Sequence, residues 1–227
     1  MHGVAGGGVW LIWGVIYVIM SISYWGRDVI RESSYQGEHT IIVRRGLKIG
    51  VVMFIVSEVM FFVGLFWSYF WSSLGGTVEI GSVWVPKGIE LMSAYEVPLL
   101  NTCILLTSGM SVTWAHNALV VGNRRGVIEG LVVTVILGGI FTAFQLYEYV
   151  HGEFKISDGI YGSTFYMLTG FHGLHVLIGT VMLVVSLIRV WRYEQTKEHN
   201  VGFEWSSWYW HFVDVVWLLL FIGVYGW

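Results

Sequence analysis

The sequence predicts an all-α fold, a polytopic membrane bundle of six transmembrane helices. First, 56% of the 227 residues are hydrophobic and 12% are charged, about half the charged share of a soluble domain. Second, the mean hydropathy of +0.68 implies more apolar surface than a soluble chain of this length can bury. Third, the chain contains repeated apolar runs, each long enough to cross a hydrocarbon core about 30 Å thick.

Six runs meet the length required of a membrane span, and we treat residues 1–227 as a single transmembrane domain. In order they cover residues 4–24, 46–72, 98–121, 127–150, 159–188 and 205–227. The longest connections, 25–45 and 73–97, are short enough to be loops. The fifth run follows ISDGIYGSTFY, residues 156–166, which predicts a turn with Asp158 capping the helix.

Basic residues lie almost entirely in alternate loops, which predicts the orientation. Ten of the twelve Lys and Arg residues fall in or next to the loops after the first, third and fifth runs, whereas Lys87 and Lys155 lie in the others. Because basic loops stay on the side from which insertion occurs, the first set is predicted to face the cytoplasm or mitochondrial matrix. Both termini then face the opposite side, and the alternation supports the count of six.

The composition excludes several classes of function. A net charge of −3 argues against nucleic acid as a partner. The single cysteine, Cys103, excludes an intrachain disulfide and a thiolate metal cluster. Because no Lys or Arg precedes Arg27, no secretory or transit signal is visible. We expect either insertion in the compartment of synthesis or removal of a leader.

One acid stands in the middle of the second run. Glu58 lies within FIVSEVMFFVGLFW, residues 54–67, where a charged group costs at least about 2.5 kcal/mol to insert. Such a residue is a candidate for handling protons or for tuning a neighbouring subunit. The alternative is an acid that only hydrogen-bonds a polar side chain of an adjacent helix. The residues alone leave both interpretations open.

The other ionisable residues within or near the ends of the runs are few: Glu148, His172, His175, His211, Asp214 and His116. His172 with His175, and His211 with Asp214, stand three positions apart and share a helix face. Such a set has the residue types that ligate iron or copper. We favour the alternative, that each polar group satisfies a hydrogen bond between packed helices.

The loop YWGRDVIRESSYQGEHT, residues 24–40, combines arginines with acidic, aromatic and histidine side chains. On an inner membrane face such a cluster can bind anionic lipid headgroups or dock another subunit. An ordinary basic loop would account for the arginines but not for the Trp, His and acidic residues.

Seven motifs together resemble the subunit III family of cytochrome c oxidase, especially its mitochondrial form. They are WGRDVIRE (25–32), SEVMFF (57–62), EVPLLNT (96–102), TWAH (113–116), SDGIYGSTF (157–165), TGFHGLHVLIG (169–179) and WYWHFVDVVW (208–217). They follow the family's order and spacing over nearly the whole chain. The family has seven helices, two in a small bundle and five in a larger one, with lipids in the cleft between them. This sequence begins at the family's second helix, so the resemblance implies one helix plus a five-helix bundle around a lipid cleft.

For function, the resemblance implies a non-redox subunit of the oxidase. Haem and copper belong to partner subunits I and II, and this chain has no catalytic residue, metal or cofactor of its own. It packs on subunit I, stabilises it and supports proton uptake while the complex reduces oxygen and pumps protons. The expected location is the mitochondrial inner membrane, with both termini on the intermembrane-space side.

For individual residues, the resemblance implies that Glu58 is the family's buried carboxylate beside the lipid cleft and modulates proton uptake. It assigns structural polar roles to His172, His175, His211 and Asp214. Phospholipid contacts, with cardiolipin as a candidate on the inner side, are implied for Trp25, Arg31, Ser33, Ser34, His39, Arg189 and Arg192.

The residues also fit two other interpretations of the chain. The nearer one is the equivalent subunit of a bacterial cytochrome c or quinol oxidase. The other, from a different class, is a self-contained membrane cytochrome or proton-coupled transporter that uses Glu58 and the histidines directly.

Overall fold

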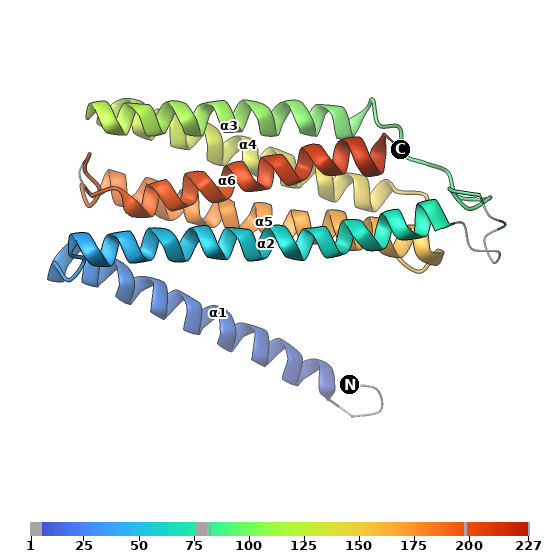
Figure 1. The fold of residues 1–227 in the computed structure, drawn as a ribbon, viewed down its shortest axis with the longest axis horizontal. Helices are drawn as coiled ribbons and strands as arrows, with labels where there is room; N and C mark the ends of the chain where they lie inside the picture. Colours follow the sequence, from blue (N-terminus) through green and yellow to red (C-terminus); the bar gives the residue numbers. More distant parts are fainter. Residues whose placement is uncertain (1–5, 76–80, 82, 198, 227) are drawn as a thin grey trace. The chain divides into compact units, whose positions relative to one another are not determined.

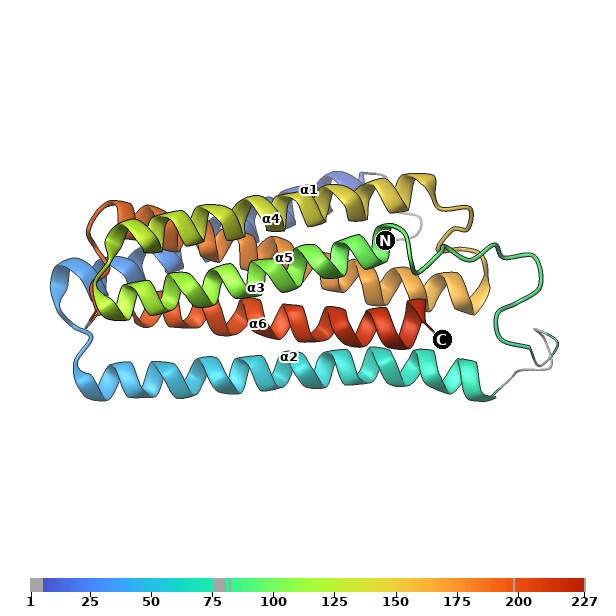
Figure 2. The same cartoon turned by 90° about the horizontal axis from the view of Figure 1, so that it is seen from above.

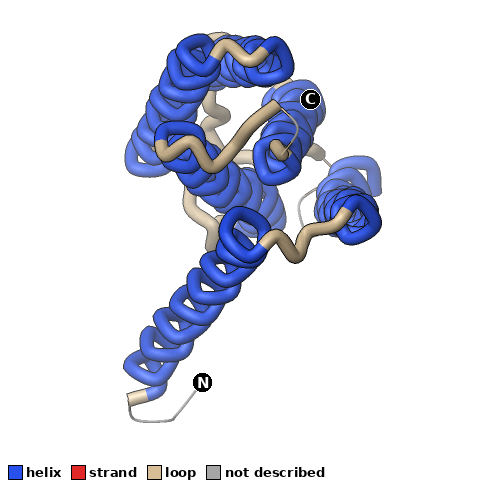
Figure 3. The backbone as a smooth tube through the Cα atoms, turned by 90° about the vertical axis from the view of Figure 1, so that its left-hand side faces the viewer, coloured by secondary structure: helices blue, strands red, loops and turns tan. Residues whose placement is uncertain are grey.

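A computed structural model describes residues 6–75, 81, 83–197 and 199–226, and its regular structure there is entirely helical (Figures 1 and 3). The helices are α1 (Gly7–Arg31), α2 (Ile41–Gly75), α3 (Val97–Val121), α4 (Arg124–His151), α5 (Gly159–Trp191) and α6 (Val201–Leu220). A π-helical turn follows α1 (η1, Glu32–Gln36) and another follows α6 (η3, Phe221–Tyr225). Within these described ranges, six helical segments are long and apolar enough to cross a membrane, so the all-α, six-span prediction is confirmed.

Several helices extend beyond the predicted spans. The first continues to Arg31, past the expected end near residue 24, and α2 begins at Ile41 rather than near residue 46. Hydropathy marks where the hydrocarbon core ends, whereas the backbone hydrogen bonds of a helix continue into the polar interface. Polar and basic residues therefore stay helical outside the apolar run.

The turn between α3 and α4 is specified locally. Gly122 adopts a left-handed φ of 85°, and the N–H of Asn123 donates to the carbonyl of Ala118 at 2.8 Å, which closes the end of α3. The Asn123 side chain then accepts from the N–H of Gly126 at 3.3 Å and caps α4. Because only two residues separate the helices, α3 and α4 must run antiparallel as neighbours.

Asp158 does not cap α5 as predicted. It occupies the position before the helix, but its carboxylate accepts from the backbone N–H of Lys155 at 2.7 Å and makes no capping bond within α5. The side chain thus closes the preceding turn, a choice that Asp makes readily because it can bond nearby backbone groups in either direction.

Contacts divide the chain into two compact units, Met1–Leu47 and Lys48–Trp227. The first unit holds α1, which buries none of its residues, together with η1 and the start of α2. The second holds the rest of α2 and helices α3 to α6. The description of the chain as one transmembrane domain remains a prediction.

Within the second unit, α2 lies beside α6 at the edge of the bundle (Figure 2). Side chains rather than close backbones make the contact. The rings of Phe62 and Phe212 are 6.0 Å apart, and the Tyr69 hydroxyl donates to the carbonyl of Val224 at 3.4 Å. At the other end of α6, Lys48 Nζ lies 2.5 Å from Glu204 Oε2. These contacts fix which face of α2 meets the bundle.

Trp210 of α6 is the point at which four helices meet. Its side chain is fully buried, and its indole N–H donates to Ser108 Oγ of α3 at 2.9 Å. A Cβ added to Gly138 of α4 would lie 2.8 Å from the indole, and one added to Gly179 of α5 would lie 2.9 Å from it. The two glycines therefore make the space that the indole occupies.

We expect Gly138→Ala to lower the free energy of unfolding by about 1–3 kcal/mol, because overpacking at Trp210 outweighs the gain in helix propensity. Gly139→Ala is the matched control, since a Cβ there meets nothing within 4 Å, and it should be neutral or stabilise by up to about 1 kcal/mol. Thermal unfolding in detergent micelles measures both. Equal effects of the two substitutions would contradict the proposed packing at Trp210.

Candidate functional site

The acid in the middle of the second span is paired with a histidine of the fifth. Glu58 Oε2 of α2 lies 2.9 Å from His175 Nε2 of α5. The side chains are 23% and 8% exposed, respectively. Sequence spacing did not predict that Glu58 and His175 pair, because the two residues are 117 positions apart.

The second ring nitrogen of His175 decides what the pair can do. Its Nδ1 lies 2.6 Å from the carbonyl oxygen of Phe171, and because a carbonyl only accepts, Nδ1 carries a hydrogen and donates it. One further hydrogen then lies between Nε2 and Glu58. It belongs either to a protonated carboxyl facing a neutral ring or to an imidazolium facing a carboxylate. The pair is neutral as a unit in both cases, which limits the cost of burying it.

Aromatic rings surround this pair. The His175 ring lies 4.9 Å from that of Phe62, and the rings of Tyr209 and Phe212 each lie 6.2 Å from it. Phe61 stacks on His175 at 6.3 Å. Because these rings come from α2 and α6, they hold the imidazole between the two helices and keep its orientation toward Glu58. The site can therefore hold and exchange one proton inside an apolar shell.

His172, one turn before His175, has a different role. It is fully buried, and its Nε2 donates to the carbonyl of Val213 at 3.2 Å. Phe141 and Trp217 pack around the ring at 5.7 and 5.1 Å. The two histidines share a helix but bind different groups, so His172 ties α5 to α6 while His175 faces α2.

The pair in α6 is looser. His211 Nδ1 lies 3.7 Å from Asp214 Oδ2, and His211 Nε2 lies 3.2 Å from the hydroxyl oxygen of Thr113. The His211 side chain is 43% exposed, whereas that of Asp214 is 10% exposed. The structure thus brings together the two residues predicted to share a face, at the boundary between α6 and α3.

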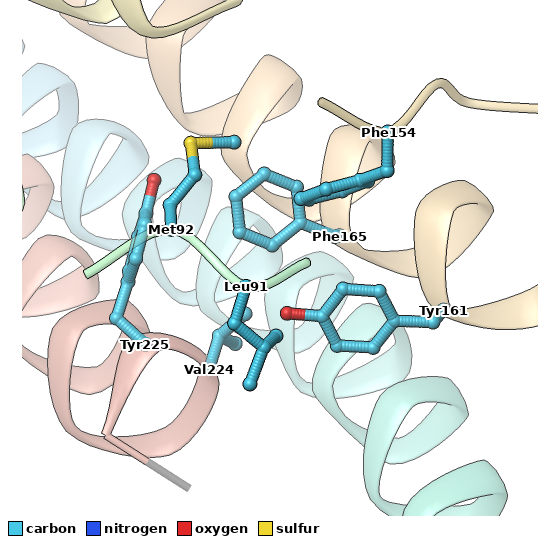
Figure 4. Close-up of a pocket in the computed structure, with 7 residues that line it drawn as sticks. All are labelled: Leu91, Met92, Phe154, Tyr161, Phe165, Val224 and Tyr225. Atoms are coloured by element: carbon cyan, nitrogen blue, oxygen red, sulfur yellow. The ribbon is translucent and has the colours of Figure 1, made fainter. Parts of the chain in front are cut away.

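A second buried acid forms a hydrogen bond between two helical segments that the sequence did not predict. The hydroxyl of Tyr225 in η3 donates to Glu148 Oε1 of α4 at 2.7 Å. Beside Tyr225 a cavity of about 20 Å³ has room for one water molecule (Figure 4). The available signal was Glu148 itself, an acid near the end of a span, but no periodicity links it to a tyrosine 77 positions away.

The residues expected to meet lipid lie in two places. In the first unit, Trp25 is 71% exposed and Arg31 is exposed at the end of α1, while Ser33, Ser34 and His39 are half-buried. The Ser33 hydroxyl donates to the carbonyl of Ile30 at 2.9 Å. In the second unit, Arg192 is exposed, but the Arg189 side chain is only 14% exposed and its Nε lies 3.4 Å from Glu194 Oε2.

Among the residues that the structure describes, no three His, Cys, Asp or Glu side chains come together in a group that could hold a metal ion. The histidines and acids instead form separate pairs between helices, such as Glu58 with His175.

The chain is similar along its whole length to known proteins. The family model described as cytochrome c oxidase subunit III matches residues 1–227. Proteins named cytochrome c oxidase subunit 3 from Prototheca wickerhamii and Arabidopsis thaliana are 54% and 53% identical over all of this chain and 87% and 86% of their own lengths. The protein of that name from Ornithorhynchus anatinus is 52% identical over 96% of this chain and 83% of its own.

We expect His175→Leu to lower the free energy of unfolding by about 3 kcal/mol, because it leaves the Glu58 carboxyl buried without its partner. The double variant Glu58→Leu/His175→Leu should be more stable than His175→Leu alone, since the unpaired acid is then gone. Thermal unfolding in detergent micelles tests the order.

The control for this cycle is His116→Leu. His116 is half-buried and stacks on Phe203 at 5.8 Å, with no part in the Glu58 pair. Its effect should simply add to that of Glu58→Leu. If the effects of Glu58→Leu and His175→Leu on the free energy of unfolding also add in the double variant, the two groups are not energetically coupled.

Proposed function

Because the chain belongs to the family of cytochrome c oxidase subunit III, a subunit of the oxidoreductase complex IV, we propose that it is a non-redox core subunit that stabilises subunit I and supports proton uptake during oxygen reduction. Membership of the family makes it a multi-pass protein of the mitochondrial inner membrane within the respiratory chain. Haem and copper are proposed to lie in partner subunits, with no redox step in this chain.

The pair of Glu58 and His175 carries this proposal. An acid in a membrane span is a candidate for function, and here the acid shares one hydrogen with an imidazole at 2.9 Å. Moving that hydrogen across the bond converts a neutral pair into a carboxylate–imidazolium ion pair but leaves the net charge of the pair unchanged. Such a pair can accept or release a proton for a neighbouring subunit through a small change in its surroundings, since each form is already desolvated and hydrogen-bonded.

The arrangement also supports a modulating role rather than a catalytic one. His175 donates its other hydrogen to a backbone carbonyl of its own helix, and its other neighbours include the rings of Phe62 and Tyr209. A carboxyl in this setting tunes the electrostatics or hydration of the proton path in a neighbour, and does not itself conduct protons across the membrane.

The proposed orientation places both termini on the intermembrane-space side. It rests on the basic loops, since Arg124, Arg125, Arg189 and Arg192 gather at the end of the bundle where α3 joins α4 and α5 joins α6. Phospholipid contacts at that side are proposed for Arg192, which is exposed, and for Trp25, Arg31, Ser33, Ser34 and His39 of the first unit. Arg189 is a weaker candidate for a headgroup because it is engaged with Glu194.

In the assembled oxidase, Glu58→Gln should leave assembly and the optical spectrum of the haems intact but slow proton uptake or shorten the lifetime of turnover. The amide keeps the shape of the side chain but cannot exchange a proton. Glu148→Gln is the control, because Glu148 is a more deeply buried acid that is bonded to Tyr225 rather than to an imidazole. Proton uptake and lifetime equal to wild type in Glu58→Gln would make the carboxyl structural only.

We expect Arg31→Gln to lower the amount of anionic phospholipid that copurifies with the complex, since each basic residue near the membrane surface contributes about 1 kcal/mol of attraction. Arg27→Gln is the control, because Arg27 Nη2 already pairs with Asp28 at 2.9 Å. Native mass spectrometry with added cardiolipin measures retention, and phosphatidylcholine should be retained equally by all forms. Equal cardiolipin retention by both variants would remove Arg31 from the lipid site.

A further inference from the structure

Tyr209 of α6 brings a hydroxyl into the apolar shell of His175. The other described rings around this imidazole are phenylalanines, namely Phe61, Phe62 and Phe212. The Tyr209 ring lies 6.2 Å from the imidazole and within 16° of its plane, and the residue is only 3% exposed. Because a buried hydroxyl costs free energy unless it forms a hydrogen bond, a tyrosine at this position indicates a polar partner nearby.

The packing of Tyr209 places it at the depth of the pair of Glu58 and His175. Its ring stacks on Phe54 of α2 at 6.4 Å, and a Cβ added to Gly179 of α5 would lie 3.4 Å from it. Phe54 stands one turn before Glu58 and shares its face of α2. The Glu58 carboxyl is close enough to the Tyr209 hydroxyl for the two to interact electrostatically.

The hydroxyl and the carboxyl each have hydrogen-bonding capacity that is not used. The Tyr209 hydroxyl forms no hydrogen bond with any residue that the structure describes. Glu58 directs Oε2 to His175, while its Oε1 has no hydrogen-bond partner within the same described ranges. A carboxylate has about four lone-pair sites and a phenol offers one hydrogen, so the two groups are chemically matched.

We propose that Tyr209 is a positioning residue for the hydrogen that Glu58 and His175 share, because its hydroxyl donates to the free oxygen of the Glu58 carboxylate. The bond forms as Glu58 becomes charged, since the flexible glutamate side chain turns its free oxygen toward the phenol. Hydrogen bonds to a charged oxygen are about twice as strong as those to a neutral one. Tyr209 therefore favours the carboxylate–imidazolium form of the pair over the neutral form.

Infrared spectroscopy of the assembled oxidase tests the proposal. The carbonyl stretch of a protonated carboxyl reports the neutral form of the pair, and the band of Glu58 is the one that disappears in Glu58→Gln. Tyr209→Phe removes the hydroxyl but keeps the ring, so it should raise the ratio of the neutral form to the ion pair about fivefold. A Glu58 band equal to that of wild type in Tyr209→Phe would overturn the proposal.

Tyr161→Phe is the matched control. Tyr161 of α5 is also 3% exposed, and its hydroxyl likewise forms no hydrogen bond with a described residue. It borders the cavity beside Tyr225 rather than the Glu58 pair (Figure 4). The Glu58 band should therefore be unchanged in Tyr161→Phe. An equal increase of the band in both variants would show a general effect of losing a buried hydroxyl and would contradict the role of Tyr209.

A double-mutant cycle measures the same contact without reference to the protonation form. Tyr209→Phe should lower the folding equilibrium constant about threefold when Glu58 is present, the average effect of an interhelical hydrogen bond in membranes. In the Glu58→Leu background it should have no effect, because the acceptor is gone. Thermal unfolding of the full chain in detergent micelles measures both. Equal effects in the two backgrounds would mean that the hydroxyl bonds another group, and the proposal would be wrong.

This inference rests on the proposed function, since it names a residue that sets the form of the Glu58 pair, but the two fail separately. The infrared band and the cycle report the bond between Tyr209 and Glu58, whereas the prediction for Glu58→Gln concerns proton uptake. Normal uptake in Glu58→Gln with a larger band in Tyr209→Phe would reject the function and keep the bond. Impaired uptake with an unchanged band would reject only the role of Tyr209.

Discussion

The burial of Trp210 is the constraint on which the bundle depends. One indole touches α4 and α5 where Gly138 and Gly179 leave space, and it donates a hydrogen bond to Ser108 of α3. Because Gly179 lies one turn from His175 in the same helix, this contact also sets the rotation of α5 about its axis. That rotation directs His175 toward α2, while Tyr209, the neighbour of Trp210, stacks on its ring. The packing of a tryptophan thus helps to position the imidazole that meets Glu58.

The lack of water in a bilayer explains the rest of the polar architecture. A polar side chain within the hydrocarbon core must find its partner in protein. His172 bonds Val213, Trp217 bonds Thr102 at 2.9 Å and Glu148 bonds Tyr225, so each bond ties two helices together. The bonds have the same physical origin as that of Glu58, but the Glu58 bond joins a carboxyl to an imidazole across two helices.

Satisfied and unsatisfied polar groups have different meanings in such a protein. Glu58 has its imidazole within the chain, so its function can be argued from this chain alone. Asp214 is nine-tenths buried but has one oxygen without a partner among the described residues, and the His211 beside it is open to the surroundings.

The sequence by itself determined the all-α class, the six spans and the candidate residues, because hydrophobic length and the spacing of ionisable residues are local properties of a chain in a membrane. The pairing of His211 with Asp214 was also predictable, since three positions in a helix fix a shared face. Spacing was misleading for Asp158, whose carboxylate had two backbone groups within reach, and it gave no separate roles to His172 and His175. Only the tertiary structure decided that Glu58 meets His175, that Glu148 meets Tyr225 and that His211 remains uncovered. These partners come from different helices, and their meeting depends on how packing fixes the rotation of each helix, at Trp210 for α3 to α6 and at Phe62 for α2, which no periodicity along one helix encodes.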